Sequence, residues 1–514
     1  MIRFVIVASL LMVSILPSSA RETARGDILT GRYAGKAQDS ALDTLDFALQ
    51  ITEHNGVVTG TVSTEFGVSP IVGGTYRSGN LTLSFDVGGT EVSLTAKVEG
   101  RQIQCTYSAS TNHGTALLNL ISRNPVFNPD SITSLTKAQW REDVLFFATE
   151  LERRHADAFH RITRQDYNKS VAALVAAIPH LKYFEIIVGM ERITAMVGDA
   201  HTYVHLPDVF HRFPLSLYWF GSDLRVLRTT RPYKRVLGAR LVAINGTPIL
   251  SVRDKIREIF SQDETELLFL ASSPELMMNA EVLDSLRIVP NLKRAVFSFM
   301  DDNDKRFDMT INPGGMHPDL TVCNVTVPTG FQSGHDPFAI RSIEDGKVIY
   351  ATFKAYDNLE ENAKKLFDLI DANPPDKLII DMRQNSGGDF LIGRKYLIDE
   401  VKKRRVVNQK GRLFILVGRS TFSAAMSNAA DFRNNCEAIL VGEPIGERPN
   451  SFQERRLLIL PNSNTVISYS TEYYSFAEKN VSAIVPDKQI DPSWESFKRG
   501  RDPAMEWILA YPGL

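Results

Sequence analysis

The chain has 514 residues, 43% of them hydrophobic, which is more than one compact core holds, so several domains are expected. Its 58 Lys and Arg residues nearly balance its 60 Asp and Glu residues, and no long basic run is interleaved with aromatic residues, which argues against a nucleic-acid partner. The cysteines and histidines are scattered without ligand spacing, so we expect no disulfide framework, no metal and no organic cofactor, and a metal hydrolase is disfavoured.

The first 20 residues have the pattern of an export signal. Arg3 supplies a positive start, an apolar stretch runs from Phe4 to Leu16, and small residues suit cleavage after Ala20. This apolar stretch is shorter than the roughly 20 residues that a membrane-spanning helix needs. We therefore predict a secreted or periplasmic protein without stable membrane insertion, whose mature chain begins near Arg21.

Short runs of alternating apolar and polar residues fill the chain from 28 to 124. Two of these runs are Phe47–Ile51 and Leu81–Phe85, and turn signals such as Asn55-Gly56 separate neighbouring runs. The pattern is typical of an antiparallel meander that forms a small barrel or sandwich. Small barrels usually fill their interior with their own side chains, so an accessory domain is favoured over a lipid-binding barrel.

Between residues 130 and 205 the apolar period becomes helical. The spacing of apolar residues from Val144 to Leu151 and from Phe184 to Met196 predicts at least two amphipathic helices. The second helix is expected to end at Gly198, and the turn Gly198-Asp199-Ala200-His201-Thr202 precedes a short strand. A histidine in such a turn can project from the fold, so His201 is a candidate functional residue.

A small mixed domain is expected from 206 to 265. Asn245-Gly246 predicts a tight turn between two strands, and a helix is expected from about Val252 to Phe260. Residues 266–330 are assigned to a helix and strands that bridge to the next domain. The polar, glycine-containing stretch at 328–337 is the predicted linker.

From 338 to 514 strands and helices alternate, which predicts a mainly parallel sheet covered by helices. The first helix is expected over Asp357 to Ala372 with Asp357 as its cap, because Glu360 stands three residues later. Two strands, Leu378–Met382 and Leu413–Val417, lead directly into segments rich in Gly and Ser. Ligands in this architecture bind at the carboxyl ends of the strands, so we place the functional site there.

Ser423 is the candidate nucleophile. It follows the second of these strands and is expected just inside the start of a helix, where the backbone field is positive. Ser and Thr are also common helix caps, and capping by Ser420 or Thr421 would explain the same motif without catalysis.

The other groups that a serine nucleophile needs are available. Amides of Gly387 or Gly388 at the neighbouring strand end, together with that of Ala424, can hold the oxyanion of a tetrahedral intermediate. His201 is the best-placed base, because an imidazole with a pKa of about 6.5 suits neutral pH. A loop histidine that only bonds its neighbours is the alternative, and His205, two residues on, is a weaker candidate.

Together these motifs resemble the carboxyl-terminal processing, or tail-specific, family of serine peptidases, which includes the tricorn type. The resemblance rests on the runs Asp381–Asp389, Ser420–Ala425, Leu440–Pro444 and Val485–Asp487 and on the Gly198–Thr202 turn. It implies an α/β multidomain fold that has a crotonase-like (ClpP-like) protease core, a helical segment and a degenerate PDZ-like module at about 206–265. The N-terminal antiparallel β domain lies outside the resemblance.

The resemblance also separates two branches by their base. One branch uses a lysine four residues after the proline of Gly442-Glu443-Pro444, where this chain has Arg448, and a guanidinium stays protonated and cannot act as a base. The histidine-base branch fits His201. In that branch Ala200 stands in place of an expected helper serine, and Glu478 is the match for a catalytic glutamate.

The resemblance therefore implies an exported serine endopeptidase that works through an acyl-enzyme on Ser423 with His201 as general base. Its partners would be polypeptides, favoured at flexible or C-terminal segments, because a strand-like peptide can add to a sheet edge beside the site. The alternative is a catalytically weak or inactive protein on the same fold that binds peptides or apolar ligands, and Arg448 and Ala200 favour it.

Overall fold

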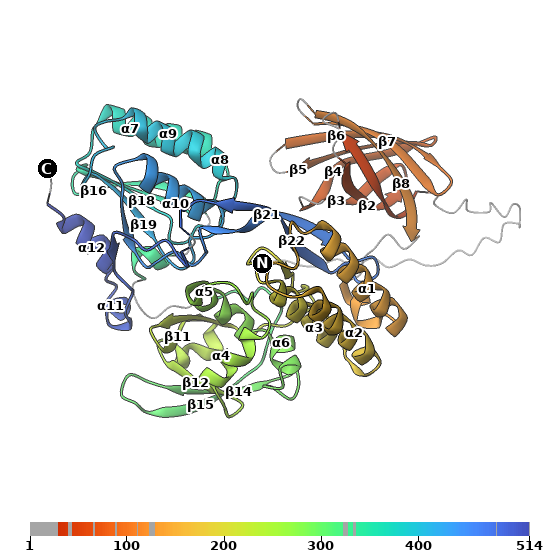
Figure 1. Cartoon of the computed structure of the whole chain (residues 1–514), viewed down its shortest axis with the longest axis horizontal. Helices are drawn as coiled ribbons and strands as arrows, with labels where there is room; N and C mark the ends of the chain where they lie inside the picture. The colour runs from red at the N-terminus through yellow and green to blue at the C-terminus, as the bar shows by residue number, and fades with distance from the viewer. Residues whose placement is uncertain are drawn as a thin grey trace, which may run out of the picture. The chain divides into compact units, whose positions relative to one another are not determined.

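The computed structural model describes residues 29–39, 44–64, 67–87, 90–109, 112–122, 129–321, 327–332, 336–479 and 481–512. The chain forms two compact units, which divide near residue 126 (Figure 1). The predicted export signal lies outside the described residues. Over the described ranges, no helix is at once long enough and apolar enough to cross a membrane.

The first unit is a closed barrel of eight strands in sequence order, in which β8 pairs antiparallel with β1. Its strands are β1 (Gly31–Asp39), β2 (Thr44–His54), β3 (Val57–Thr64), β4 (Gly67–Arg77), β5 (Asn80–Val87), β6 (Thr90–Glu99), β7 (Gln102–Ala109) and β8 (Asn112–Ser122). Asn55 and Gly56 both have positive φ, 52° and 83°, as the tightest hairpin turns require. Leu49, Leu83 and Leu118 are fully buried in the barrel's own hydrophobic cluster, so the predicted antiparallel β domain is confirmed.

The second unit begins with three helices, which are α1 (Lys137–Arg154), α2 (Arg164–Ala177) and α3 (Tyr183–Val197). A capping box between Thr136 and Gln139 starts α1. Helix α3 ends at Gly198, as predicted, because this glycine adopts the left-handed conformation, with φ of 110°, that closes many helices. The turn that carries His201 therefore begins at a defined point.

A long hairpin from far downstream packs on these helices. It consists of β21 (Asn450–Ile459) and β22 (Val466–Ser475), and β22 also pairs with the short β9 (Tyr203–Val204). Leu458 and Ile467 of the hairpin share a buried cluster with the apolar faces of α1 and α3. This pairing fixes the segment after His201 against the C-terminal part of the chain.

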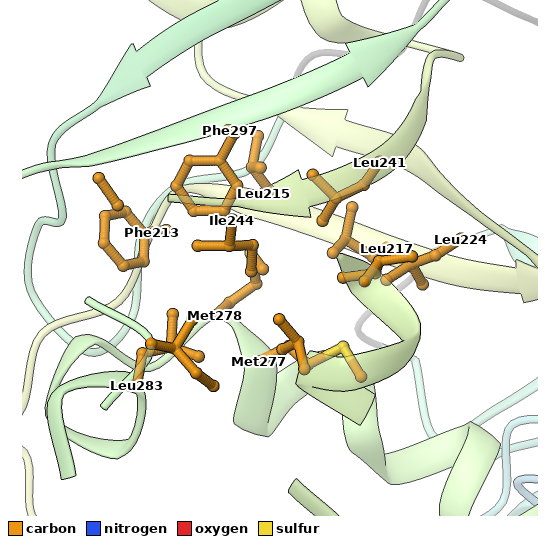
Figure 2. Packing of buried hydrophobic residues seen from close by; sticks show 14 of the residues in the cluster. Phe213, Leu215, Leu217, Leu224, Leu241, Ile244, Met277, Met278, Leu283 and Phe297 are labelled. Carbon is orange, nitrogen blue, oxygen red and sulfur yellow. The ribbon is translucent and has the colours of Figure 1, made fainter. Parts of the chain in front are cut away.

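A sheet with the order β10-β11-β12-β14-β15, in which β13 pairs with β12, forms the middle domain, residues 213–311. Its elements are β10 (Leu215–Phe220), β11 (Asp223–Thr229), β12 (Arg240–Ile244), β13 (Thr247–Pro248), β14 (Ala295–Met300), β15 (Arg306–Ile311), α4 (Ile249–Arg257), α5 (Glu266–Met277) and α6 (Ala280–Ser285). Figure 2 shows Ile244 and Phe297 of the sheet packed with Met277 and Leu283 of the helical side. Residues 206–265 and part of 266–330 therefore share one sheet and one core.

The last sheet has the order β16-β17-β18-β19-β20-β23, and every pairing except β16 with β17 is parallel, which confirms the predicted mainly parallel sheet. Its strands are β16 (Phe338–Ile343), β17 (Val348–Phe353), β18 (Lys377–Asp381), β19 (Leu413–Val417), β20 (Ile439–Gly442) and β23 (Lys488–Gln489). Alternate residues of β19 enter two separate clusters, Leu413 and Ile415 in one and Phe414 and Leu416 in the other. Both faces of this sheet are therefore buried.

Helices cover these two faces. One cluster includes residues of α7 (Leu359–Ala372), of α9 (Asp399–Lys403) and the π-helical turn before it, and of α10 (Ala424–Asn435), while the other includes α12 (Pro503–Ala510). Two further short helices are α8 (Phe390–Gly393) and α11 (Trp494–Lys498). The predicted cap of α7 is wrong. Asn358, not Asp357, precedes the helix, and its positive φ of 51° leaves no side-chain cap.

Candidate active site

Two loops at the carboxyl ends of β18 and β19 lie side by side because hydrogen bonds join them. The amide of Phe422 donates to the carbonyl of Asn385 at 3.0 Å, and the hydroxyl of Thr421 donates to the carbonyl of Met382 at 2.9 Å. Thr421 is fully buried, so its hydroxyl serves this junction and does not cap α10. The two sequence motifs therefore form one surface.

Ser423 occupies the position before the first turn of α10, and its backbone conformation is unusual, with φ of 54° and ψ of −126°. A residue with a side chain pays about 1–3 kcal/mol for such a conformation and keeps it only where the surroundings enforce it, which is common at functional sites. The Ser423 hydroxyl makes no cap hydrogen bond to the helix. It contacts a histidine instead.

That histidine is His201, which lies 222 positions earlier in the chain, and its Nε2 is 3.0 Å from Oγ of Ser423. This is the separation that a general base and its nucleophile need. The ring is 6% exposed and stacks on Phe422 with 4.6 Å between ring centroids. Burial lowers the pKa of His201 to about 4, although Asp199 opposes the shift, so the imidazole is neutral at pH 7 and can accept a proton.

Asp199 holds the turn that carries His201. Its Oδ1 accepts hydrogen bonds from the His201 amide at 3.1 Å and the Ser470 hydroxyl at 2.6 Å, and its Oδ2 lies 2.9 Å from Nε2 of His155. Nδ1 of His155 accepts from the Asp157 amide at 3.0 Å, so the proton of a neutral His155 sits on Nε2 and points at Asp199. Burial opposes the charge of Asp199, but these hydrogen bonds outweigh burial and lower its pKa.

Glu447 lies beside both reacting groups. Its Oε2 accepts a hydrogen bond from the Ser423 amide, and its Oε1 is 3.7 Å from Nδ1 of His201 and 3.5 Å from the Ser451 hydroxyl. Within the described part of the chain, Nδ1 of His201 is buried and makes no hydrogen bond of normal geometry, although the backbone of Phe452 is near enough to the ring to raise its pKa. Burial and the nearby Glu264 raise the pKa of Glu447 well above its usual value.

The structure does not bring Glu478 to this pair. Glu478 is exposed and lines a surface hollow beside the last turn of α10, whereas Ser423 lies at the first turn. The 12 residues of α10 put about 18 Å between these ends. Sequence reasoning missed Glu447, which stands directly before Arg448, because nothing in its neighbourhood distinguishes it from an ordinary loop carboxylate.

The weaker base candidate, His205, is engaged elsewhere. Its Nε2 lies 2.8 Å from the hydroxyl of Ser468 on β22, and burial lowers the pKa of His205 to about 4. The two residues that depart from the family pattern face the middle domain. The guanidinium of Arg448 lies 3.5 Å from Asp263, and the amide of Ala200 donates to the Glu264 carboxylate.

Gly387 and Ala424 flank the nucleophile. Gly387 approaches Ser423 so closely that an added Cβ would lie 2.7 Å from the Cβ of the serine, and its φ of 111° also favours glycine. Its amide donates to the side chain of Asn385 at 2.9 Å. Among the described residues, the amides of Gly388 and Ala424 make no recorded hydrogen bond, and Ala424 begins α10, where amides point out of the helix.

A pocket of ≈ 560 Å³ adjoins the pair. Its walls come from the segment Tyr203–Leu206 after the histidine, from α5 of the middle domain, and from Ser386 and Phe422 of the two site loops. Most of its side chains are apolar, including Leu268 and Leu276 of α5. The pocket can therefore receive an apolar group beside Phe422, the residue before Ser423.

Two solved structures of mature CPAF share this architecture. Mature CPAF matches over 72% of this chain and 96% of its own, with a TM-score of 0.51 and 11% identity. Mature CPAF complexed with lactacystin matches over 72% and 97%, with a TM-score of 0.50 and 10% identity. The photosystem II D1 C-terminal processing protease matches over 72% and 99%, with a TM-score of 0.36 and 15% identity.

The sequence itself matches no protein-family model, and no curated protein is a match. The likeness to CPAF is one of fold, since so few residues are identical. The chain thus has the fold of mature CPAF, and its motifs resemble those of the C-terminal processing peptidases.

Proposed function

We propose that this protein is an exported serine endopeptidase in which Ser423 attacks the peptide bond and His201 is the general base. The observation that carries the proposal is the 3.0 Å separation between Nε2 of His201 and Oγ of Ser423 on a backbone turn that the surrounding loops hold. The neutral state of His201 at pH 7 supports its role, because only a neutral imidazole accepts the serine proton.

The reaction has two halves. In the first, Oγ of Ser423 bonds to the carbonyl carbon while its proton moves to Nε2 of His201, and collapse of the tetrahedral intermediate passes that proton to the leaving amine. In the second, His201 takes a proton from water, the water oxygen bonds to the acyl carbon, and Ser423 regains its proton as the acid leaves.

Backbone amides and Glu447 have supporting roles in this proposal. We assign the oxyanion hole to the amides of Gly388 and Ala424, because the Gly387 amide is already bonded to Asn385. Gly387 lets the two loops approach each other. Glu447 takes the place that the family resemblance gave to Glu478, since its carboxylate is the one near Nδ1 of His201.

The substrates are flexible or C-terminal polypeptide segments. His201 is almost fully buried and Ser423 is half-buried, so only an unfolded segment can bring a backbone carbonyl to the Ser423 hydroxyl. The apolar pocket beside the pair supports a substrate with an apolar side chain near the cleaved bond.

The rival function, ligand binding without catalysis, is favoured by the same pocket and by the raised pKa of Glu447, because a raised pKa disfavours the ionised carboxylate that would support His201. A fluorophosphonate probe separates the two, because it reacts only with an activated serine. We expect the wild type to become labelled and the Ser423→Ala variant to remain unlabelled. Equal, negligible labelling of both would reject the peptidase and support the binding protein.

A further inference from the structure

The segment Ser261–Thr265 of the middle domain, here called the bridging segment, joins the two parts of the chain that carry His201 and Glu447. On one side, the Ser261 hydroxyl donates to the carbonyl of Asp199 at 2.6 Å, and the Asp263 amide donates to the carbonyl of Gly198 at 3.2 Å. On the other side, Thr265 bonds through its hydroxyl to the carbonyl of Gly446.

Glu264 is the partly buried acid of this segment. Its Oε1 accepts a hydrogen bond from the Ala200 amide at 3.2 Å, next to His201. Its Oε2 is buried and, among the described residues, has no hydrogen-bond partner. An isolated buried carboxylate oxygen is costly, and the cost falls when a proton sits on it or is shared with another acid.

The charged groups around Glu264 are mostly acidic. Asp199 faces it from the histidine turn, Glu447 and Arg448 from the segment before β21, and Asp263 from its own segment. The guanidinium of Arg448 also lies 3.5 Å from Asp263, so its positive charge offsets the negative charge of Glu264 only in part. Two carboxyl groups thus adjoin the His201 turn, that of Glu264 at the Ala200 amide and that of Glu447 at Nδ1 of His201.

We propose that Glu264 is a positioning residue that acts through Glu447: the charge of Glu264 opposes ionisation of the neighbouring acid, and Glu264 thereby sets when Glu447 is ionised beside His201. The proposal rests on the proposed function, because only an ionised Glu447 can stabilise the imidazolium that forms when Ser423 loses its proton. Ionisation of these two acids, and not of His201, then sets the acidic limb of the pH profile of kcat/KM.

The directions of the pKa shifts of Glu264, Glu447 and His201 agree with this proposal. Burial and the charge of Asp199 raise the pKa of Glu264 to about 7. Burial and the charge of Glu264 raise the pKa of Glu447. The pKa of His201 is lowered to about 4, so His201 has already lost its proton where the acids begin to titrate.

The test is Glu264→Gln, which keeps an acceptor for the Ala200 amide and removes the charge. The acidic midpoint of kcat/KM is expected to move to lower pH by about one unit, because a like charge no longer opposes ionisation of Glu447. Glu264→Ala, which also loses the hydrogen bond, should show the same shift with a lower kcat. Glu266→Gln is the matched control, since Glu266 is exposed and paired with Arg257.

Thermal unfolding supplies a readout that needs no activity. An acid whose pKa is raised in the folded state contributes stability below its unfolded pKa, and that contribution is lost as the pH rises through the folded pKa. Relative to wild type, Glu264→Gln should therefore gain Tm between about pH 5 and pH 8, and Glu266→Gln should not. Unchanged pH dependence of both Tm and kcat/KM in Glu264→Gln would overturn the proposal. A retained Tm effect without labelling of wild-type Ser423 would reject the peptidase and leave the acid pair standing.

Discussion

At the scale of single residues, Glu447 and Arg448 are adjacent and opposite in charge, and they make contacts with different parts of the molecule. Arg448 stands where one branch of the resembled family has a lysine base, and it turns to Asp263 of the middle domain. Glu447, the residue before it, bonds to the Ser423 amide and faces His201. Since a guanidinium cannot accept a proton at neutral pH, the base has to come from elsewhere, and the structure offers His201.

The first prediction separates the two candidate glutamates. Glu447→Gln removes the charge near Nδ1 of His201, so kcat is expected to fall about 100-fold or more, as when a catalytic histidine loses its orienting carboxylate. Glu478→Gln lies on an exposed loop and should change kcat by less than about twofold. Steady-state hydrolysis of an internally quenched peptide measures both, and the opposite ranking would return the role to Glu478.

The pair formed by Ser423 and His201 was predictable from local sequence, whereas the residues that hold this pair in place were not. Ser423 follows a buried strand and His201 follows a helix that stops at Gly198, and both features can be read within ten residues. Asp199 is bonded to Ser470 on β22 and Glu447 to Ser451 on β21, and these contacts form only when the hairpin folds back. No local pattern encodes that return.

At the scale of elements, the site depends on how closely two strand ends approach. The loop after β18 and the loop after β19 meet with Gly387 against Ser423, and the amide of Phe422 joins them. The regular parts of this region were predictable, since β18 and β19 are continuous apolar runs. The start of α7 was not predictable, because Asn358 precedes the helix in a left-handed conformation and makes no side-chain cap hydrogen bond.

The second prediction concerns the close contact between the two loops at Gly387 and Ser423. Gly387→Ala would place a Cβ 2.7 Å from the Cβ of Ser423 at a φ of 111°, so one of the loops has to move. We expect kcat/KM to fall about 100-fold or more, because the oxyanion donors lose their alignment with the nucleophile. The Tm should also fall, since alanine is strained at this φ.

Gly315→Ala is the matched control for this substitution. An added Cβ at Gly315 meets no atom within 4 Å, so its Tm and kcat/KM should stay close to those of the wild type. If Gly387→Ala keeps kcat/KM within about threefold of the wild type, the close packing of the two loops does not support catalysis.

At the scale of the whole molecule, each compact unit has its own hydrophobic interior. The cluster of the barrel draws only on residues from Leu29 to Leu120, and the clusters of the second unit draw only on residues from Ile132 onward. The middle domain shows the limit of sequence reasoning at this scale. Its β14 and β15 follow three helices, so the chain gives no local sign that they complete the sheet that β10 began.

The third prediction follows from the separate interiors. Every residue that the proposal places at the site belongs to the second unit, including His201, Ser423 and Glu447, and so does the apolar pocket. A chain that begins at Pro129 should therefore fold and react with a fluorophosphonate at a rate within about twofold of the full chain. Circular dichroism establishes that the shortened chain is folded, and Ser423→Ala in the same background is the control. A folded chain that no longer reacts would show that the barrel contributes to the active site.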